Sequence, residues 1–138
     1  MVDKSVLLAC SVGRAFDLFT AHVSEWWPVT HRRSKDPASR IHLLESGRFY
    51  EAAPDGSEFE MGRVKSWEQP DRIVLDFYLG TAPDAPTEVT ITFTAEGSGT
   101  RVDVRHRPGA ASEELWNSRA PVFARSWDAV LPALAELS

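Results

Sequence analysis

The sequence contains a single cysteine, Cys10, so no disulfide can form within the chain. Basic residues are not in excess: 15 lysines and arginines against 20 aspartates and glutamates give a net charge of −5, which argues against a nucleic-acid-binding protein. No stretch approaches the roughly 20 apolar residues that a membrane span requires, and no signal peptide is visible after the first methionine. We therefore expect a cytoplasmic protein with no membrane span and no nucleic-acid partner.

Motifs for metal, phosphate or nucleophilic chemistry are also missing. The four histidines show neither HxH nor HExxH spacing, and one cysteine cannot supply a zinc ligand cluster. The glycines at 97 and 99 lie in a tight hairpin rather than between a strand and a helix, so they do not form a phosphate loop. No GxSxG motif occurs. We expect no metal and no cofactor.

The order of the elements favours one α+β domain spanning residues 1–138. The patterns predict a first strand, one helix from Val12, a short helical turn ending at Pro28, a run of strands and a helical C-terminus. The strands are expected at residues 2–10, 41–45, 48–53, 59–68, 72–79, 88–95 and 101–107. Residues 80–86 contain two prolines and are expected to form a longer connection.

Apolar spacing predicts which faces are buried. Val89, Ile91 and Phe93 alternate with threonines, which is typical of an antiparallel sheet with one wet face. In the C-terminal segment, Trp127, Val130, Leu131 and Leu134 follow helical spacing and should pack on the sheet. Pro121 is expected to break this segment into a short helix and a longer one, and Pro132 to kink the longer one.

The chain resembles the SRPBCC, or START-like, helix-grip superfamily, and within it the homologues of the heat-shock protein 90 ATPase activator. The likeness extends from about residue 6 to 134 and is carried by AFDLF at 15–19, EWWP at 25–28, GRFYE at 47–51, DG at 55–56, GRV at 62–64, WEQPDRIVL at 67–75, TRVDVRH at 100–106 and SWDAVL at 126–131. The resemblance implies a curved antiparallel sheet of about six or seven strands around a long C-terminal helix. It also implies two short helices after the first strand, and a cavity between sheet and helix.

Members of this superfamily include carriers of hydrophobic ligands as well as polyketide cyclases and aromatases. The resemblance therefore favours a protein that binds a small hydrophobic or amphipathic molecule in the cavity. An enzyme of cyclase or hydrolase type that uses the same cavity is the alternative, and a chaperone-activator-like interaction protein is the second alternative. The sequence favours binding, because catalysis needs two well-placed groups and only one stands out.

His106 is that group, because strand alternation places it on the same face as Val102 and Val104. A histidine there could bind or protonate a ligand, although a hydrogen bond to the backbone or the helix is the more common role of a buried imidazole. The expected apolar wall of the cavity is formed by Phe77, Phe123, Trp26 or Trp27, and Trp116. Core or lid packing is the alternative for the tryptophans, and exposed indoles at 26, 27 or 116 could also form a homodimer contact.

Charged residues give weaker signals. Arg63 shares an alternation face with Met61 and Trp67, so it could pair with a ligand carboxylate, but a solvated position is slightly favoured. Glu51 or Glu60 could serve as an acid, yet neither has a visible partner. The basic segment at 31–35 could attract an anionic ligand, although most such segments are simply solvated.

Overall fold

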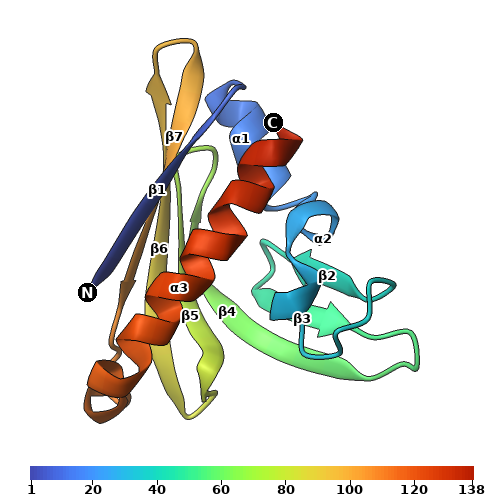
Figure 1. The fold of residues 1–138 in the computed structure, drawn as a ribbon, viewed down its shortest axis with the longest axis vertical. Helices are drawn as coiled ribbons and strands as arrows, with labels where there is room; N and C mark the ends of the chain where they lie inside the picture. Colours follow the sequence, from blue (N-terminus) through green and yellow to red (C-terminus); the bar gives the residue numbers. More distant parts are fainter.

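The computed structural model describes all residues, 1–138, and consists of one seven-stranded antiparallel sheet and three α-helices (Figure 1). The strands are β1 (Val2–Leu8), β2 (Arg40–Leu43), β3 (Arg48–Ala52), β4 (Glu58–Glu68), β5 (Arg72–Ala82), β6 (Ala85–Glu96) and β7 (Gly99–Arg107). The helices are α1 (Val12–Phe19), α2 (Val23–Trp26) and α3 (Glu113–Leu137), with a 3₁₀ turn at Val29–His31. The predicted α+β helix-grip architecture, with two short helices after the first strand, is confirmed.

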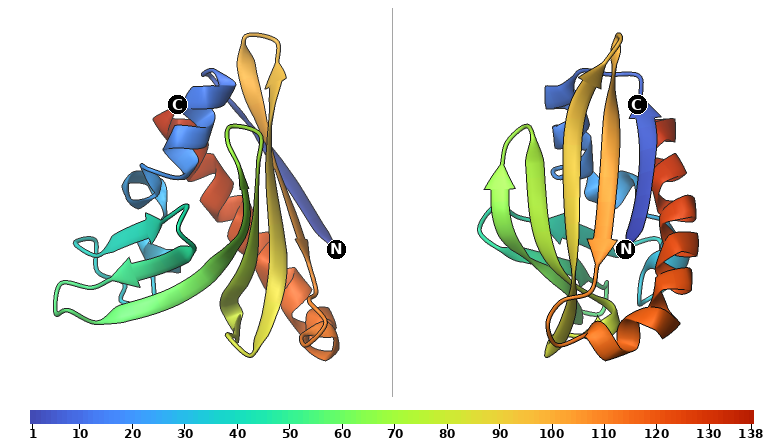
Figure 2. Two further views of the ribbon diagram at one scale, coloured as in Figure 1. Left: turned by 180° about the vertical axis from the view of Figure 1, so that it is seen from behind. Right: turned by 90° about the vertical axis from the view of Figure 1, so that its left-hand side faces the viewer.

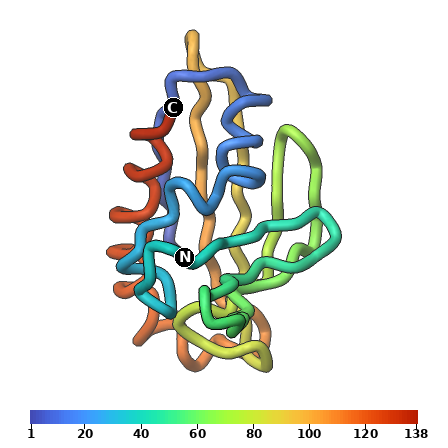
Figure 3. The backbone as a smooth tube through the Cα atoms, turned by 90° about the vertical axis from the view of Figure 1, so that its right-hand side faces the viewer, coloured from blue at the N-terminus to red at the C-terminus, as the bar shows by residue number.

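The strand order is β1-β7-β6-β5-β4-β3-β2, so every strand except β1 pairs with a neighbour in sequence. The sheet is strongly curved, and α3 runs diagonally across its inner side next to β1 (Figures 1 and 2). The helices α1 and α2 follow β1 and lie on the same side of the sheet as α3 (Figure 3). The curvature thus encloses one core between the sheet and the three helices.

Twenty-six buried apolar residues form this core. Trp127, Val130, Leu131 and Leu134 of α3 are all buried, as their spacing predicts. The ring of Phe16 on α1 meets Phe93 and Trp67 edge to face at centroid distances of 5.2 and 5.3 Å. Aromatic side chains therefore fill much of the space inside the curved sheet.

The C-terminal helix is continuous over 25 residues, so the expected break at Pro121 is wrong. Both Pro121 and Pro132 lie inside the helix on its exposed side. A proline within a helix removes one backbone hydrogen bond and bends the axis without having to end the helix. Figure 2 shows this effect near the start of α3, where the first turns lie at an angle to the rest.

Three irregularities in the sheet alter the simple alternation. Met61 and Lys65 are extra residues in β4, at the register shifts against β3 and β5. The third is larger: residues 78–81 of β5 oppose Pro86 of β6 alone, between the pairs Phe77–Thr87 and Ala82–Ala85. The connection expected at 80–86 is therefore mostly strand, closed by a tight turn. We refer to residues 78–81 as the β5 bulge.

None of the helices combines the length and the apolar character that crossing a bilayer requires.

Candidate functional site

A groove of about 470 Å³ opens between β4, the β5 bulge and the segment that follows α2, residues 27–39. Its apolar surface comes from Phe59, Met61, Leu79, Ala82 and Pro83. The remaining lining residues are His31, Arg33, Glu51, Glu58, Glu60, Tyr78, Gly80 and Thr81. A mostly apolar surface with a few polar groups is the usual composition of a small-molecule site.

A second, much smaller cavity of about 60 Å³ lies under α3. Its lining includes the rings of Trp27, Phe77, Phe123 and Trp127. The groove and this cavity share His31 and Leu79 in their walls, so the aromatic interior adjoins the groove. A further pocket of about 90 Å³ lies between β1 and α3, so the larger room for a ligand lies at the groove.

The β5 bulge forms one wall of the groove because Gly80 lets it pack closely on α3. Gly80 adopts a φ of +81°, a region that favours glycine. A Cβ at this position would lie 2.6 Å from Cε1 of Phe123. The neighbouring Thr81 has a buried hydroxyl oxygen with no hydrogen-bond partner in the protein. The bulge therefore contains one unsatisfied polar group, buried beneath the surface of the groove.

The opposite wall is held by two buried charged side chains. The Arg32 guanidinium donates to the carbonyl oxygens of Trp27, Ser39 and Ser24 at 2.7–3.1 Å. The Glu51 carboxylate, fully buried, accepts hydrogen bonds from the amide of Arg33 at 2.8 Å and from the hydroxyl of Ser34. Burial opposes ionisation of Glu51, but these hydrogen bonds outweigh it and lower its pKa. The segment after α2 is thus tied to β3.

Two basic side chains from this segment border the groove. The Arg33 guanidinium lies over the ring of Phe59, 4.9 Å from its centroid. The imidazole of His31 contacts the hydroxyl of Thr30 at 3.0 Å. Partial burial, and secondarily the charge of Lys35, lower the pKa of His31, which favours its neutral form. Arg33 is therefore the positive group of the groove.

His106 lies in the core and not in the lining of the groove or of the small cavity. Its imidazole is fully buried, 3.1 Å from Nε1 of Trp127 and 2.7 Å from Oγ1 of Thr87. The rings of Phe123 and Phe77 lie at centroid distances of 4.1 and 5.2 Å. Burial lowers the pKa of His106 to about 3, so the side chain is neutral near pH 7. Both ring nitrogens are occupied by protein partners.

The structure brings together some of the other predicted site residues and separates the rest. Trp27, Phe77 and Phe123 share the small cavity. Trp26 is buried in the core, where its Nε1 donates to the carbonyl of Leu18 at 2.6 Å, and Trp116 is half-buried beside His106.

Arg63 is exposed, and its expected position on one face with Met61 and Trp67 is wrong. Two extra residues, one on each side of Arg63, shift the alternation of β4, so Arg63 faces out while the others face in.

Leu79, Thr81 and Phe59 line the groove but were not expected there. A glycine inside an apolar strand, as at Gly80, often marks a bulge, and this is the signal that could have identified the wall. Glu51 lies two residues after Phe49 in the strand, and residues two apart share a face. This spacing indicates that the side chain of Glu51 faces inward.

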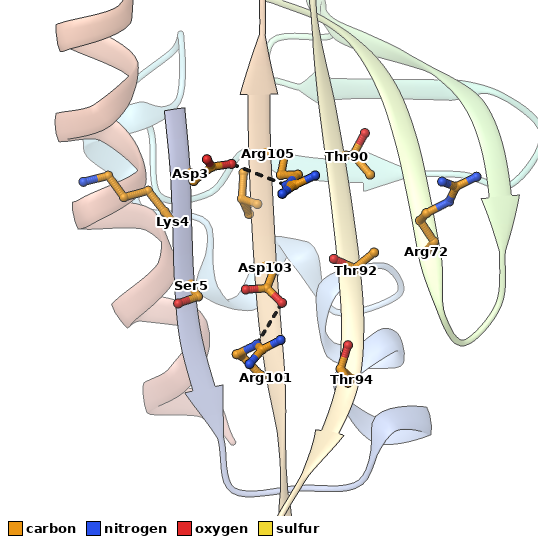
Figure 4. Close-up of a pocket in the computed structure, with 11 residues that line it drawn as sticks. Asp3, Lys4, Ser5, Arg72, Thr90, Thr92, Thr94, Arg101, Asp103 and Arg105 are labelled. Atoms are coloured by element: carbon orange, nitrogen blue, oxygen red, sulfur yellow. Dashed lines mark hydrogen bonds and ion pairs between the residues drawn. The ribbon is translucent and has the colours of Figure 1, made fainter. Parts of the chain in front are cut away.

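The largest hollow, of about 610 Å³, lies on the outer face of the sheet over β1, β7, β6 and β5 (Figure 4). Ten of its eleven lining residues are polar or charged, and four of the charged ones form two pairs: Arg101 with Asp103 at 2.9 Å and Arg105 with Asp3 at 3.5 Å. A shallow, self-paired surface of this kind offers little apolar area to a ligand. The groove is the better candidate site.

Comparison with solved structures supports the fold. CalC from Micromonospora echinospora, a self-sacrificing resistance protein, is 29% identical, with 98% of this chain and 91% of that chain covered and a TM-score of 0.77. Txn09, an anthrahydroquino-γ-pyrone synthase complexed with SUM, is 27% identical over 99% and 96% of the two chains, with a TM-score of 0.60. Protein Ms6760 from Mycobacterium smegmatis shares the fold at 15% identity, with 98% and 88% covered and a TM-score of 0.63.

Comparison with proteins of curated function gave no match. The family model described as Activator of Hsp90 ATPase homolog 1-like protein matches residues 9–138, nearly the whole chain. The predicted resemblance is confirmed, and the chain belongs to this family.

Proposed function

We propose that this protein binds a small, amphipathic aromatic molecule in the groove between β4, the β5 bulge and the segment after α2. The observation that carries the proposal is the groove itself: about 470 Å³, lined by five apolar residues together with polar and charged ones. This volume falls within the roughly 300–1,000 Å³ typical of small-molecule sites. The 60 Å³ cavity alone has room for only about two water molecules.

The adjoining aromatic cavity extends the groove toward the core. Phe77 and Phe123 form its wall together with Trp27 and Trp127. A ring bound in the groove would meet Leu79 and His31, the two residues that border both spaces. Phe77, Phe123 and Trp27, which were predicted to form the wall around the ligand, would therefore support it from behind. His106, the predicted polar contact, would act only through the packing of Phe123.

The name of one similar protein supports the ligand class. Txn09 is named as a synthase of an anthrahydroquino-γ-pyrone. We propose by analogy that the ligand of this chain is a planar, multi-ring aromatic compound. Binding is favoured over catalysis because the buried His106 is neutral and bonded at both nitrogens, which leaves it no proton-transfer role.

An enzyme that works on such a compound is the second candidate. The observation in its favour is the similarity to Txn09, and the groove holds the Tyr78 hydroxyl and the His31 imidazole as possible proton donors or acceptors. Incubation of the protein with each aromatic ligand that it binds, followed by mass analysis, separates the two candidates. A new mass would support catalysis.

The binding proposal is tested with a panel of anthraquinones, flavones and fatty acids in thermal-shift and tryptophan-fluorescence measurements. Three proteins are compared: wild type, Ala82→Trp, which fills the groove, and Thr92→Trp, which places the same side chain on the outer face. We expect anthraquinones to stabilise wild type and Thr92→Trp but not Ala82→Trp. Equal stabilisation of all three proteins, or of none, would contradict the proposed site.

A further inference from the structure

Arg33 is the one charged side chain of the groove that has no side-chain partner. Glu58 and Glu60 both pair with Arg48, which lies outside the groove lining. Glu51 is saturated by the amides of Arg33 and Ser34 and the hydroxyl of Ser34. The guanidinium of Arg33 forms neither a hydrogen bond nor an ion pair within the protein. The guanidinium of Arg33 is therefore free to pair with a ligand anion, although Glu51, Glu58 and Glu60 also line the groove.

The surroundings of Arg33 keep this charge at the groove. Its backbone N–H donates to the buried Glu51 carboxylate at 2.8 Å, which fixes the main chain. Its guanidinium lies 4.9 Å from the centroid of the Phe59 ring, on the apolar surface of the groove. Arginine often stacks on aromatic rings in this way while its N–H groups stay free to bind an anion.

The β5 bulge does not add a second accessible polar group, since the hydroxyl of Thr81, which has no partner in the protein, is buried. A buried hydroxyl that stays unpaired costs free energy but does not reach a ligand. A ligand in the groove would thus meet the guanidinium of Arg33 from the segment after α2, with Phe59 and Leu79 as apolar surface.

We infer that the groove selects planar aromatic anions, in which the ring lies on Phe59 and Leu79 and an acidic group pairs with the guanidinium of Arg33. The inference rests on the proposed function, because it requires that the groove binds a ligand. The fork of N–H donors suits carboxylate and sulfonate oxygens, which accept two parallel hydrogen bonds. A neutral aromatic compound of the same shape gains only the apolar contacts.

A matched pair of fluorescent probes tests this selection: 1-anilinonaphthalene-8-sulfonate, an anion, and N-phenyl-1-naphthylamine, its neutral counterpart without the sulfonate. Dissociation constants are measured for wild type, Arg33→Gln, Arg33→Lys and Ala82→Trp. Arg63→Gln is the matched control, because Arg63 is an exposed arginine of β4 that lies outside the groove lining. Circular dichroism melts establish that each variant is folded.

We expect wild type to bind the anionic probe about two- to fivefold more tightly than the neutral one, as one exposed charge-assisted contact allows. Arg33→Gln should abolish this preference and leave the affinity for the neutral probe unchanged. Arg33→Lys should retain part of the preference, and Arg63→Gln all of it. Added salt should weaken only the binding of the anionic probe, and only where residue 33 is charged.

Three other outcomes would contradict the anion selection, the proposed ligand binding, or both. If wild type binds both probes equally, and Arg33→Gln changes neither affinity, the groove binds ligands but does not select anions. If Ala82→Trp binds both probes as tightly as wild type, the probes sit elsewhere and the anion selection at this groove is refuted. If no probe and no compound of the aromatic panel binds, the proposed function itself is refuted.

Discussion

Trp127 on α3 donates its indole N–H to Nδ1 of His106 on β7, and this bond determines the tautomer of the histidine. An indole nitrogen can only donate, so Nδ1 must accept and the ring proton must reside on Nε2. Nε2 then donates to Oγ1 of Thr87 at 2.7 Å, and the Thr87 hydroxyl is 3.4 Å from the carbonyl of Phe77. One directional chain of hydrogen bonds connects the helix with three adjacent strands.

Trp127→Phe should destabilise the protein because it keeps an aromatic ring but leaves Nδ1 of His106 buried without a donor. We expect the free energy of unfolding to fall by about 1–3 kcal/mol. Trp116→Phe is the control, since Trp116 is half-buried and its indole nitrogen has no protein partner. Urea denaturation followed by circular dichroism measures both. Equal, small losses in the two variants would show that the hydrogen bond contributes little.

The low pKa of His106 should make stability depend on pH. Its pKa is about 3 in the folded protein and 6.5 when exposed, so the unfolded chain binds the extra proton between these values. The contribution to stability is therefore complete above about pH 6.5 and is lost as pH falls toward 3, by up to about 1.4 kcal/mol per pH unit.

His106→Gln removes this titration while keeping a polar side chain. Between pH 5 and 6.5, above the range in which most carboxylates titrate, the stability of wild type should fall more steeply than that of the variant. The other three histidines contribute equally to both proteins, so the difference between the two curves isolates His106. Parallel curves across this range would contradict the assigned pKa.

Gly80→Ala should disturb the β5 bulge. The added Cβ would meet the ring of Phe123 at 2.6 Å in addition to a strained φ of +81°. Gly97→Ala is the matched control, because Gly97 also has a positive φ, +59°, but no atom lies within 4 Å of its Cβ position. We expect Gly97→Ala to cost about 1 kcal/mol and Gly80→Ala at least about 1 kcal/mol more, in the free energy of unfolding. Equal losses would mean that the ring of Phe123 moves away from the added Cβ at little cost in free energy.

Thr81→Val should separate stability from binding. Valine has nearly the shape of threonine but lacks the hydroxyl, which is buried and unpaired in the protein. The free energy of unfolding should stay the same or rise by up to about 1 kcal/mol. Ligand affinity should not change in the same variant, because the buried hydroxyl is not accessible from the groove. A marked loss of stability, measured by urea denaturation, would show that the hydroxyl has a structural partner after all.

Local patterns predicted most of the fold. The alternation in β6 and β7 and the spacing of Trp127, Val130 and Leu131 placed these residues on the correct faces. The bulges could not be predicted in the same way, because an extra residue reverses the alternation after it. Arg63 was assigned a partly apolar face for this reason. The helix break expected at Pro121 does not occur, because packing against the sheet holds α3 together despite the missing backbone hydrogen bond.

Fewer features of the candidate site than of the fold could be predicted from the sequence. Arg32 and Glu51 are charged residues, yet both are buried. The carbonyl partners of Arg32 come from its own loop and from α2, and the amide partner of Glu51 lies 18 residues away in the sequence. His106 was placed correctly on the inner face, but its bonds to Thr87 and Trp127 depend on the register of β6 and the position of α3. Such pairings between distant segments leave no local pattern.

The position of β1 has a consequence for the way the chain folds as it is made. Each of the strands β2 to β7 pairs with the strand that precedes or follows it, but β1 pairs only with β7, so that Val2 lies opposite His106 and Leu8 opposite Thr100. During synthesis β1 therefore has no pairing partner, and its apolar side chains stay exposed, until β7 has left the ribosome. Pairing across so much sequence is slow, and unpaired apolar strands aggregate. β1 is therefore the first strand of the sheet to be synthesised and can pair only after all the other strands have been translated.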